Sequence, residues 1–254
     1  MKVVVTGGGT IAPIDEVRHI TNASSGGFSA AITEACLARG ASVIHIHPPS
    51  ALLPFERASR FRLAESADDR LAEAEMERID RVRRRYLEVR DRLRLEPLPR
   101  GTVGDYAATL ERVLRQNPID VAFLAMAVSD YEPEPLAGKL DSREDTLLIR
   151  CRRTAKVIRS VRDWAPEVYL VGFKLLSGAS TAELIARAEE GCRTNRADLT
   201  VANDLHTVRA RRHVVHLVRP GQPPVSLGPS PSLAEDLVDR VFALTAERQR
   251  GSST

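Results

Sequence analysis

The chain has 254 residues, 43% of them hydrophobic and 28% charged, and a net charge of +3 at neutral pH. These values are typical of one soluble globular domain, the charge is too small to indicate a nucleic-acid partner, and no apolar run approaches the roughly 20 residues of a membrane helix. Because the N-terminus lacks signal-peptide features and the three cysteines are isolated, we expect a cytoplasmic protein with reduced thiols.

The first elements alternate between strand and helix. Residues 2–6, KVVVT, form a β-branched run that ends at three glycines, which predicts a buried strand. Residues 26–40 repeat apolar side chains at helical spacing and end at a glycine, which predicts a helix with a C-terminal glycine cap. Residues 41–49, ASVIHIHPP, predict the second strand. This order indicates the start of a parallel sheet.

A charge-rich segment at residues 51–103 interrupts the alternation. Its residues favour helix, and its acids and bases are interleaved at helical spacing. That pattern is typical of a solvated helix with ion pairs rather than of an RNA-binding helix. We therefore predict a single domain over residues 1–254, with residues 51–103 as a charged helical insertion within it.

The remaining chain predicts a three-layer, Rossmann-like α/β fold with a mainly parallel central sheet. In chain order we expect a helix at 106–116, a strand at 119–128, a loop at 129–145, a strand at 146–152, a helix at 155–165, a strand at 167–176, a helix at 180–193 and a strand at 197–204. A closing hairpin at 213–228 and a helix at 232–248 complete the fold.

Four polar segments directly follow or end apolar strands: TGGGT, AVSDYEP, GFKLL and AND. Ligands bind outside the carboxyl ends of the strands in open α/β sheets. We therefore predict that these segments converge on one binding site.

Two common nucleotide-binding motifs are absent. The dinucleotide fingerprint needs spaced glycines that open into a helix, whereas Gly7, Gly8 and Gly9 are contiguous and Pro13 follows them. The phosphate-loop motif needs Gly-Lys-Ser/Thr, which is missing. A helix N-terminus at NASSGG remains, where Ser24 and Ser25 are candidate caps and the free amides suit an anion. A plain capped helix fits these residues equally well.

The motifs, taken in order, resemble phosphopantothenate–cysteine ligase. TGGGTIAPIDEVRHITNASSG, AMAVSDYEP, VGFKLL and VAND carry the resemblance, which extends over about residues 2–205. VRDWAPEVYLVGFKLL and the helical insertion are more similar to the stand-alone form than to the form fused behind a flavin-dependent decarboxylase. The resemblance implies an enzyme of coenzyme A biosynthesis that joins 4′-phosphopantothenate to L-cysteine. The substrate carboxylate attacks the α-phosphate of a nucleoside triphosphate, and the cysteine amine then displaces the nucleotide.

The resemblance also implies roles for individual residues. The nucleotide is expected at Gly8, Gly9, Ser24, Ser25, Gly26, Phe173 and Asn203, with Phe173 packed on the base. Asn22 would bind phosphopantothenate and support the acyl-nucleotide stage, and Ala127 and Asp130 would bind the same substrate. Arg18 would reach the substrate phosphate of a neighbouring subunit, which implies a homodimer with shared sites. Lys139 is the second catalytic candidate, because it is the only lysine of its loop and suits triphosphate charge.

The cosubstrate and the metal are less defined by the sequence. Bacterial relatives carry a lysine cluster where only Lys139 stands, and two lysines where this chain has GCRTN. We therefore expect ATP or CTP as the cosubstrate, with turnover on ATP at least comparable to that on CTP, and Mg²⁺ as the metal. His45 and His47 share a strand face, but no third ligand has metal-site spacing, so we expect partly buried polar residues at a strand end. Two alternatives stay open: another nucleotide-activating carboxylate–amine ligase, or a non-catalytic nucleotide-binding homologue.

Overall fold

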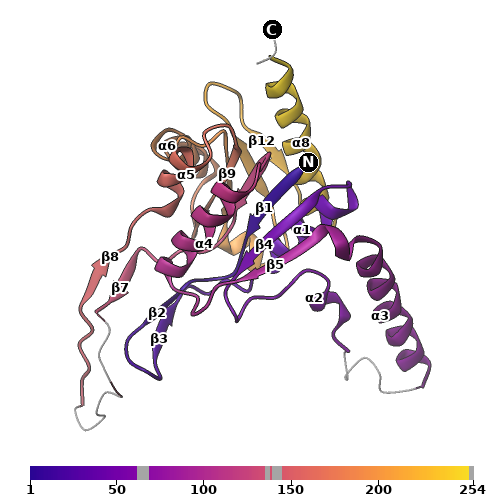
Figure 1. Ribbon diagram of the computed structural model, residues 1–254, viewed down its shortest axis with the longest axis horizontal. Coiled ribbons are helices and arrows are strands. Elements are labelled where there is room, and N and C mark those ends of the chain that lie inside the picture. The colour runs from indigo at the N-terminus through magenta and orange to yellow at the C-terminus, as the bar shows by residue number, and fades with distance from the viewer. Residues whose placement is uncertain (62–68, 135–137, 139–144, 252–254) are drawn as a thin grey trace.

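An eight-stranded sheet forms the centre of the computed structural model, which describes residues 1–61, 69–134, 138 and 145–251 (Figure 1). The strand order is β12-β11-β10-β9-β6-β1-β4-β5, and the six strands from β10 to β5 run parallel. The strands are β1 (Lys2–Thr6), β4 (Ser42–His47), β5 (Leu93–Pro97), β6 (Val121–Leu124), β9 (Tyr169–Leu176), β10 (Leu199–Asp204), β11 (Val215–Val218) and β12 (Val225–Leu227). The predicted mainly parallel sheet is confirmed.

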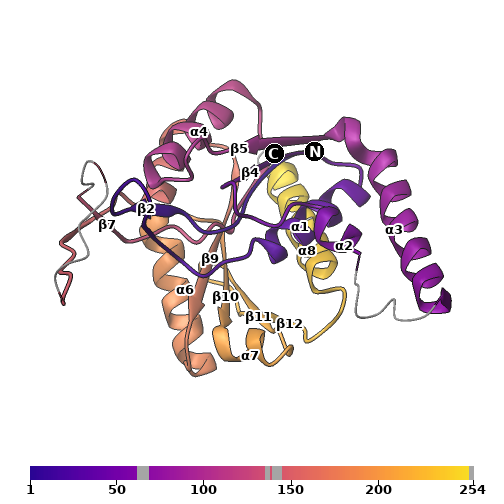
Figure 2. The same cartoon turned by 90° about the horizontal axis from the view of Figure 1, so that it is seen from below.

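Helices cover both faces of the sheet, which gives the predicted three layers (Figure 2). One face carries α1 (Gly27–Ala38) and α8 (Leu233–Gly251), and the other carries α4 (Val103–Gln116), α5 (Val161–Trp164) and α6 (Thr181–Asn195). In β1, Val3 and Val5 pack under α1 and α8, whereas Val4 packs under α4. Because successive side chains of a strand point to opposite faces, the continuous apolar run of β1 fits a strand buried on both sides.

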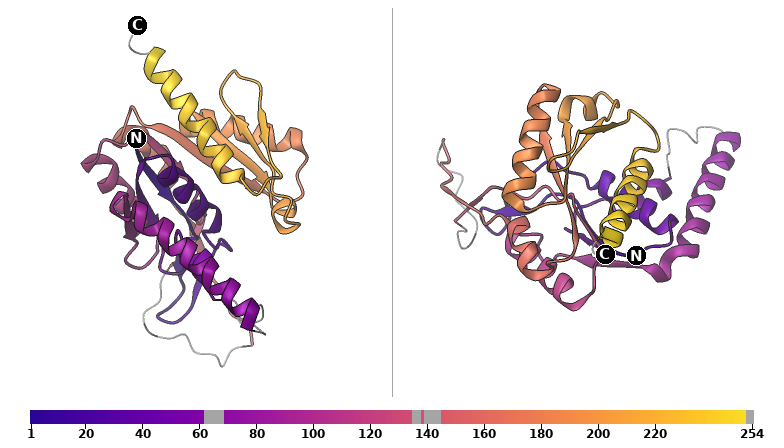
Figure 3. Two further views of the ribbon diagram at one scale, coloured as in Figure 1. Left: turned by 90° about the vertical axis from the view of Figure 1, so that its right-hand side faces the viewer. Right: turned by 90° about the horizontal axis from the view of Figure 1, so that it is seen from above.

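The segment at residues 51–103 is only partly an insertion, so the predicted boundaries are wrong at its C-terminal end. It contains α2 (Glu56–Ser59), α3 (Asp69–Val89) and the 3₁₀ turn η2 (Arg90–Arg92), but then β5 joins the sheet parallel to β4. β5 is an edge strand with three of its five residues exposed, so its sequence LRLEP carries no strong apolar signal. Figure 3 shows α3 at the outer side of the molecule, beyond α1.

Two short antiparallel ribbons extend from the sheet and differ from the predicted loop. β2 (Ile11–Pro13) pairs with β3 (His19–Thr21), and β7 (Tyr131–Pro133) pairs with β8 (Cys151–Arg153). They lie side by side in Figure 1, and we call them together the arm. Residues 131–133 of the predicted loop at 129–145 therefore form the strand β7. The predicted strand at 146–152 is replaced by the shorter strand β8, which begins at Cys151. Most residues of β3, β7 and β8 are exposed. Because these strands have no buried face, their sequences lack the alternation of apolar and polar residues by which a half-buried strand is predicted.

The other C-terminal predictions agree with the structure except in helix detail. β11 and β12 form the closing hairpin, and α8 follows it. The predicted helix at 155–165 is instead the 3₁₀ turn η3 (Val157–Ser160) followed by the single turn α5. A short helix, α7 (Leu205–Arg209), follows β10. Among the described helices, none combines the length and the apolar character that a membrane span requires.

Candidate active site

Four polar segments meet at one edge of the sheet, as the sequence predicts. Their strands, β1, β6, β9 and β10, are neighbours and run parallel. TGGGT, AVSDYEP, GFKLL and AND therefore lie at the same end of the sheet, which we call the carboxyl edge. This is the edge at which ligands bind in open α/β sheets.

The backbone of Ala127 joins the glycine loop to the loop that follows β6. Its N–H donates to the Gly8 carbonyl at 2.8 Å, and its carbonyl accepts from the Thr10 N–H at 3.1 Å. The side-chain amide of Asn22 donates to the same carbonyl at 3.3 Å. Two predicted substrate residues, Asn22 and Ala127, therefore contact each other beside the predicted nucleotide residue Gly8.

The two glycine turns of the N-terminal segment pack against each other. Gly8 has a φ of +87°, and a Cβ there would lie 2.8 Å from the ring of Pro48. Gly26 has a φ of +77°, and its Cβ would lie 3.2 Å from the Gly8 nitrogen. Both positions need glycine because of the left-handed backbone and because neighbouring atoms occupy the side-chain space. The close approach brings Gly8 and Gly26 together, as the nucleotide prediction requires.

The N-terminus of α1 is built differently from the predicted serine cap. Gly26 is the N-cap residue and supplies no side chain. The Ser25 hydroxyl, one residue earlier, accepts from the Gly27 N–H at 3.3 Å, whereas the Ser24 N–H donates to the Asn22 carbonyl at 2.8 Å. The first turn of α1 contains no acidic side chain. A helix N-terminus without a carboxylate keeps its amides and its dipole available to an anion.

Aromatic rings gather beside this helix start. The Phe28 ring lies edge-on to Phe173, with centroids 6.4 Å apart, and edge-on to His213 at 4.8 Å. The Asn203 side-chain nitrogen lies 3.1 Å from His213 Nε2. Phe173 and Asn203 are the predicted base-side residues, so the structure brings both to one cluster. Flat rings of this kind suit stacking against a nucleobase.

Phe28 and His213 are members of this cluster that the sequence analysis missed. Phe28 follows NASSGG directly, so its position next to the predicted phosphate-binding turn could have identified it as a site residue from the sequence. His213 precedes the antiparallel strand β11 and gave no such signal. Burial lowers the pKa of His213, which favours the neutral imidazole. In that form Nε2 accepts the hydrogen bond from the Asn203 amide.

Arg18 lies on the arm, in the β2–β3 hairpin. Its Nε donates to Asp15 Oδ2 at 3.0 Å, and the Asp15 side chain is fully buried. The hairpin extends away from the sheet (Figure 1), whereas Asn22 returns to the carboxyl edge. This position holds a guanidinium of fixed orientation away from the cluster of Asn22 and Ala127.

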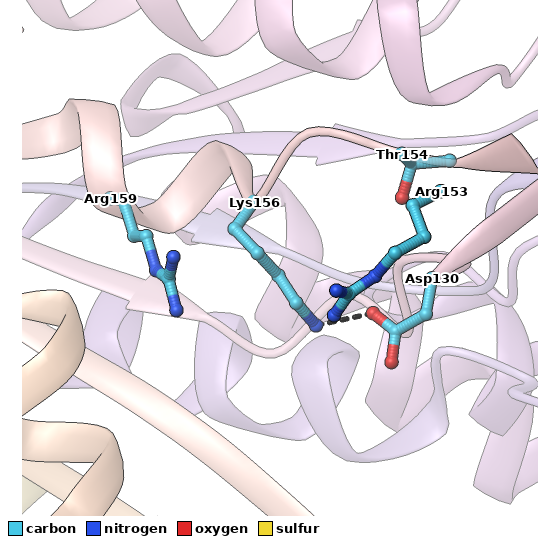
Figure 4. Close-up of a pocket in the computed structure, with 5 residues that line it drawn as sticks. All are labelled: Asp130, Arg153, Thr154, Lys156 and Arg159. Carbon is cyan, nitrogen blue, oxygen red and sulfur yellow. Dashed lines mark hydrogen bonds and ion pairs between the residues drawn. The ribbon is translucent and has the colours of Figure 1, made fainter.

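Asp130 lies in a pocket of about 320 Å³ between the arm and η3 (Figure 4). It forms an ion pair with Lys156. The Thr154 N–H donates to the Asp130 carbonyl at 3.0 Å, so β8 is tied to the loop that follows β6. The pocket is lined by Asp130, Arg153, Thr154, Lys156 and Arg159. The sequence predicts a role for Asp130 but for none of the three cations, because their segment has the pattern of an ordinary strand and helix.

Lys139 falls outside the described residues, so its predicted catalytic role remains a prediction. The described part of the chain contains no group of three or more His, Cys, Asp or Glu side chains that could hold a metal ion. Mg²⁺ commonly binds through substrate phosphates with one or two carboxylates rather than in an all-protein cage. The described residues are therefore compatible with an ion that arrives with a nucleotide.

His45 and His47 are buried rather than partly buried, which corrects the prediction made for them. Their rings stack with centroids 6.0 Å apart. Thr33 Oγ1 lies 2.7 Å from His45 Nδ1, and His45 Nε2 has no partner among the described residues. Burial, with a smaller contribution from His47, lowers the pKa of His45 to about 3.

Acid is expected to destabilise the fold through His45. An unfolded histidine has a pKa of about 6.5, so the unfolded state binds more protons between pH 6.5 and 3, and stability falls as the pH falls through this window. Between pH 7 and pH 5 the loss from this residue is about 2 kcal/mol. Denaturant unfolding should show that His45→Gln removes this part of the pH dependence. The control His19→Gln, at an exposed position, should keep it, and equal pH dependence in both variants would contradict the assignment.

The chain matches the family described as the DNA/pantothenate metabolism flavoprotein C-terminal domain over residues 1–83 and 102–244. It belongs to this family. The matched ranges contain all four segments of the carboxyl edge, and the gap between them covers the end of α3 and β5.

Several relatives of the chain are named phosphopantothenate–cysteine ligases. Phosphopantothenate–cysteine ligase 2 of Oryza sativa is 30% identical over 96% of this chain and 79% of its own length. The human phosphopantothenate–cysteine ligase is 30% identical over 81% of this chain and 72% of its own length. The bifunctional protein CoaBC of Thermococcus kodakarensis is 31% identical over 85% of this chain, which spans only 44% of that protein. The resemblance predicted from the motifs is confirmed.

Solved structures share the fold. The DNA/pantothenate metabolism flavoprotein from Streptococcus pneumoniae is 26% identical, with a TM-score of 0.74 over 96% of this chain and 99% of that one. A Cab2 mutant in complex with phosphopantothenate-cysteine is 23% identical, with a TM-score of 0.83 over 100% of this chain and 89% of that one. These matches confirm the α/β architecture.

Proposed function

We propose that the protein is a phosphopantothenate–cysteine ligase that forms 4′-phosphopantothenoylcysteine through an acyl-nucleotide. The observation that carries this proposal is the contact of Asn22, Ala127 and Gly8 at the carboxyl edge of a chain from this family. This contact puts the predicted substrate residues directly beside the predicted nucleotide residues. A reaction between a carboxylate and a nucleotide phosphate needs this adjacency.

In the first half-reaction the chain binds the nucleotide and orients its α-phosphate. The aromatic cluster of Phe28, Phe173 and His213 takes the base. The glycine loop and the N-terminus of α1, with no acid in its first turn, take the phosphates through backbone amides. The substrate carboxylate then attacks the α-phosphorus, the bond to the β-phosphate oxygen breaks, and pyrophosphate leaves. Mg²⁺ bound to the phosphates would reduce the negative charge that the carboxylate meets.

In the second half-reaction Asn22 stabilises the charge that develops on the acyl oxygen. The cysteine amine attacks the acyl carbon, and the nucleoside monophosphate leaves as the amide forms. One N–H of the Asn22 amide donates to the Ala127 carbonyl and fixes the side chain, while the other is available to the substrate. A positioned donor of this kind acts as an oxyanion-hole group.

A homodimer would complete the site, because Arg18 lies on the arm rather than beside Asn22. The arm and the segment that leads into β8 also expose large apolar side chains, among them Val17 at 62%, Tyr131 at 55% and Leu148 at 91% relative exposure. Clustered exposed apolar residues mark association surfaces. We therefore propose that a second copy of the chain covers the arm and receives Arg18 at its substrate phosphate.

ATP is expected to support turnover at least as well as CTP. Stacking in the aromatic cluster accepts any base, so the choice between ATP and CTP depends on polar groups such as the Asn203–His213 pair. A base whose edge does not match these groups leaves polar atoms without hydrogen bonds and binds more weakly. Competition between the two nucleotides in one assay measures the preference. A strong preference for CTP would contradict this prediction and leave the ligase proposal intact.

The decisive experiment combines purified protein with phosphopantothenate, cysteine, Mg²⁺ and either nucleotide. Release of pyrophosphate together with the ligated product supports the proposal. Pyrophosphate release only with a different acid or amine would favour another nucleotide-activating ligase. Nucleotide binding without any turnover would favour a non-catalytic homologue.

A further inference from the structure

We propose that Thr10 is the positioning residue of Asn22, the amide that stabilises the acyl oxygen in the second half-reaction. This inference rests on the proposed function, because positioning matters only for a reaction in which Asn22 acts. Thr10 is the last residue of TGGGT and is fully buried. It is therefore shielded from ligands at the carboxyl edge and acts through the groups that it holds.

All three polar groups of Thr10 form hydrogen bonds. Its N–H donates to the Ala127 carbonyl at 3.1 Å, and its carbonyl accepts from the Thr21 hydroxyl at 2.9 Å. Its hydroxyl oxygen accepts from the Ser129 N–H at 2.9 Å. Thr21 directly precedes Asn22 in the chain. Thr10 therefore joins the loop that follows β6 to the segment that carries Asn22.

The Ala127 carbonyl is the acceptor that Thr10 and Asn22 share. It accepts from the Thr10 N–H and, at 3.3 Å, from the Asn22 side-chain amide. The direction of this carbonyl therefore sets where the Asn22 amide lies and where its second N–H points. The bond from the Ser129 N–H to the Thr10 hydroxyl fixes the backbone two residues further along the same loop. A displacement of about 1 Å is enough to remove most of the effect of a positioned group.

The residue before Thr10 supports Asn22 from the backbone side. A Cβ on Gly9 would lie 2.4 Å from the Asn22 carbonyl oxygen and 3.3 Å from Thr21 Oγ1. The backbone of Asn22 therefore lies directly on Gly9, and a side chain at that position would displace it. Asn22 is itself an exposed residue, so packing around its side chain contributes little to its orientation. Its orientation depends on this backbone contact and on the hydrogen bonds that Thr10 organises.

Variants of nearly equal size separate positioning from folding. Thr10→Val keeps the shape of the side chain but removes the oxygen that accepts from Ser129, which leaves a buried N–H without an acceptor. We expect product to form about tenfold or more slowly, with accumulation of the acyl-nucleotide and little change in the Michaelis constant for the nucleotide. Thr10→Ser keeps the oxygen and should restore product formation. Thr245→Val is the matched control, because this buried threonine donates to the Val241 carbonyl within α8.

A double-variant cycle tests whether Thr10 acts through Asn22. Residues that act as a unit are not additive, so Thr10→Val should slow Asn22→Asp by less than about twofold further. Wild-type product formation in Thr10→Val, or an equal loss in both backgrounds, would overturn the proposal. If Thr10→Val does not fold, Thr21→Val applies the same two criteria from an exposed position, because it removes the bond to the Thr10 carbonyl.

Nuclear magnetic resonance measures the positioning without turnover. In protein that contains isotopically labelled asparagine, the side-chain amide signal of Asn22 is identified by its absence from Asn22→Asp. Thr10→Val should shift this signal and leave that of Asn117 unchanged, because Asn117 donates to the Val113 carbonyl at the end of α4. An unmoved Asn22 signal would overturn the proposal even in an active enzyme. A protein that shows the shift but forms no product would contradict the proposed function and leave the positioning of Asn22 by Thr10 supported.

Discussion

Asn22→Asp is expected to release pyrophosphate but to accumulate the acyl-nucleotide. Aspartate keeps the size of the side chain, but its carboxylate cannot donate to the acyl oxygen and would repel the charge that forms there. Removing one such donor costs about 10²-fold or more in rate. Rapid-quench analysis with labelled phosphopantothenate separates the two half-reactions, because the intermediate and the product are resolved directly.

Asn117→Asp provides a matched control for this variant. The Asn117 amide donates to the Val113 carbonyl at 2.9 Å, so it makes the same kind of bond at the C-terminal end of α4. Its substitution should leave both half-reactions at wild-type rates. Wild-type turnover in Asn22→Asp would contradict a role for Asn22 in the second half-reaction. The same holds if the variant neither releases pyrophosphate nor forms product, because the first half-reaction would then have failed.

Arg18→Ala is expected to raise the Michaelis constant for phosphopantothenate about tenfold or more and to change that for the nucleotide little. A charge-assisted hydrogen bond to a phosphate contributes roughly 1.5–3 kcal/mol, and 1.4 kcal/mol corresponds to a factor of ten. Initial rates with each substrate varied in turn give both constants. Sedimentation at assay concentrations reports the oligomeric state in parallel.

Mixing the two impaired variants, assayed at a subsaturating concentration of phosphopantothenate, tests whether Arg18 acts across subunits. In a heterodimer of Arg18→Ala and Asn22→Asp chains, one of the two sites receives wild-type Arg18 and wild-type Asn22, because a two-fold dimer exchanges equivalent surfaces. Random mixing should then restore about a quarter of wild-type sites. No recovery, or a fully active monomer, would place Arg18 in the site of its own chain or outside any site.

The sequence predicted those parts of the site that depend on strand order. TGGGT and AND follow strands that are buried on both faces, so their apolar runs were visible, and parallel pairing then brings them to one edge. β5 and the arm strands lie at edges or in solvent, and their positions depend on pairing with distant residues rather than on a local pattern.

The residues missed by the sequence analysis reach the site through tertiary contacts. His213 meets Phe28 across 185 positions of sequence, and Arg153 reaches Asp130 only because β8 folds back on β7. The serine cap was predicted from composition, but the left-handed turn at Gly26 moved both serines ahead of the helix. The residue at which α1 begins is set by the left-handed backbone conformation of Gly26, and residue composition does not encode that conformation.

The hydrogen bonds of Ala127 continue the pairing of β1 with β6 beyond the ends of both strands, through the bridge between Gly9 and Ala127. The backbone of Gly8, Gly9 and Ala127, which we call the floor of the site, is therefore an extension of the sheet. It is not a loop that must become ordered when nucleotide and substrate bind. Binding then loses little backbone entropy at this point, since the geometry exists before either ligand arrives. Small fragments that span Gly8 and Ala127 should for the same reason bind efficiently for their size, which makes this floor a rational starting point for inhibitor design.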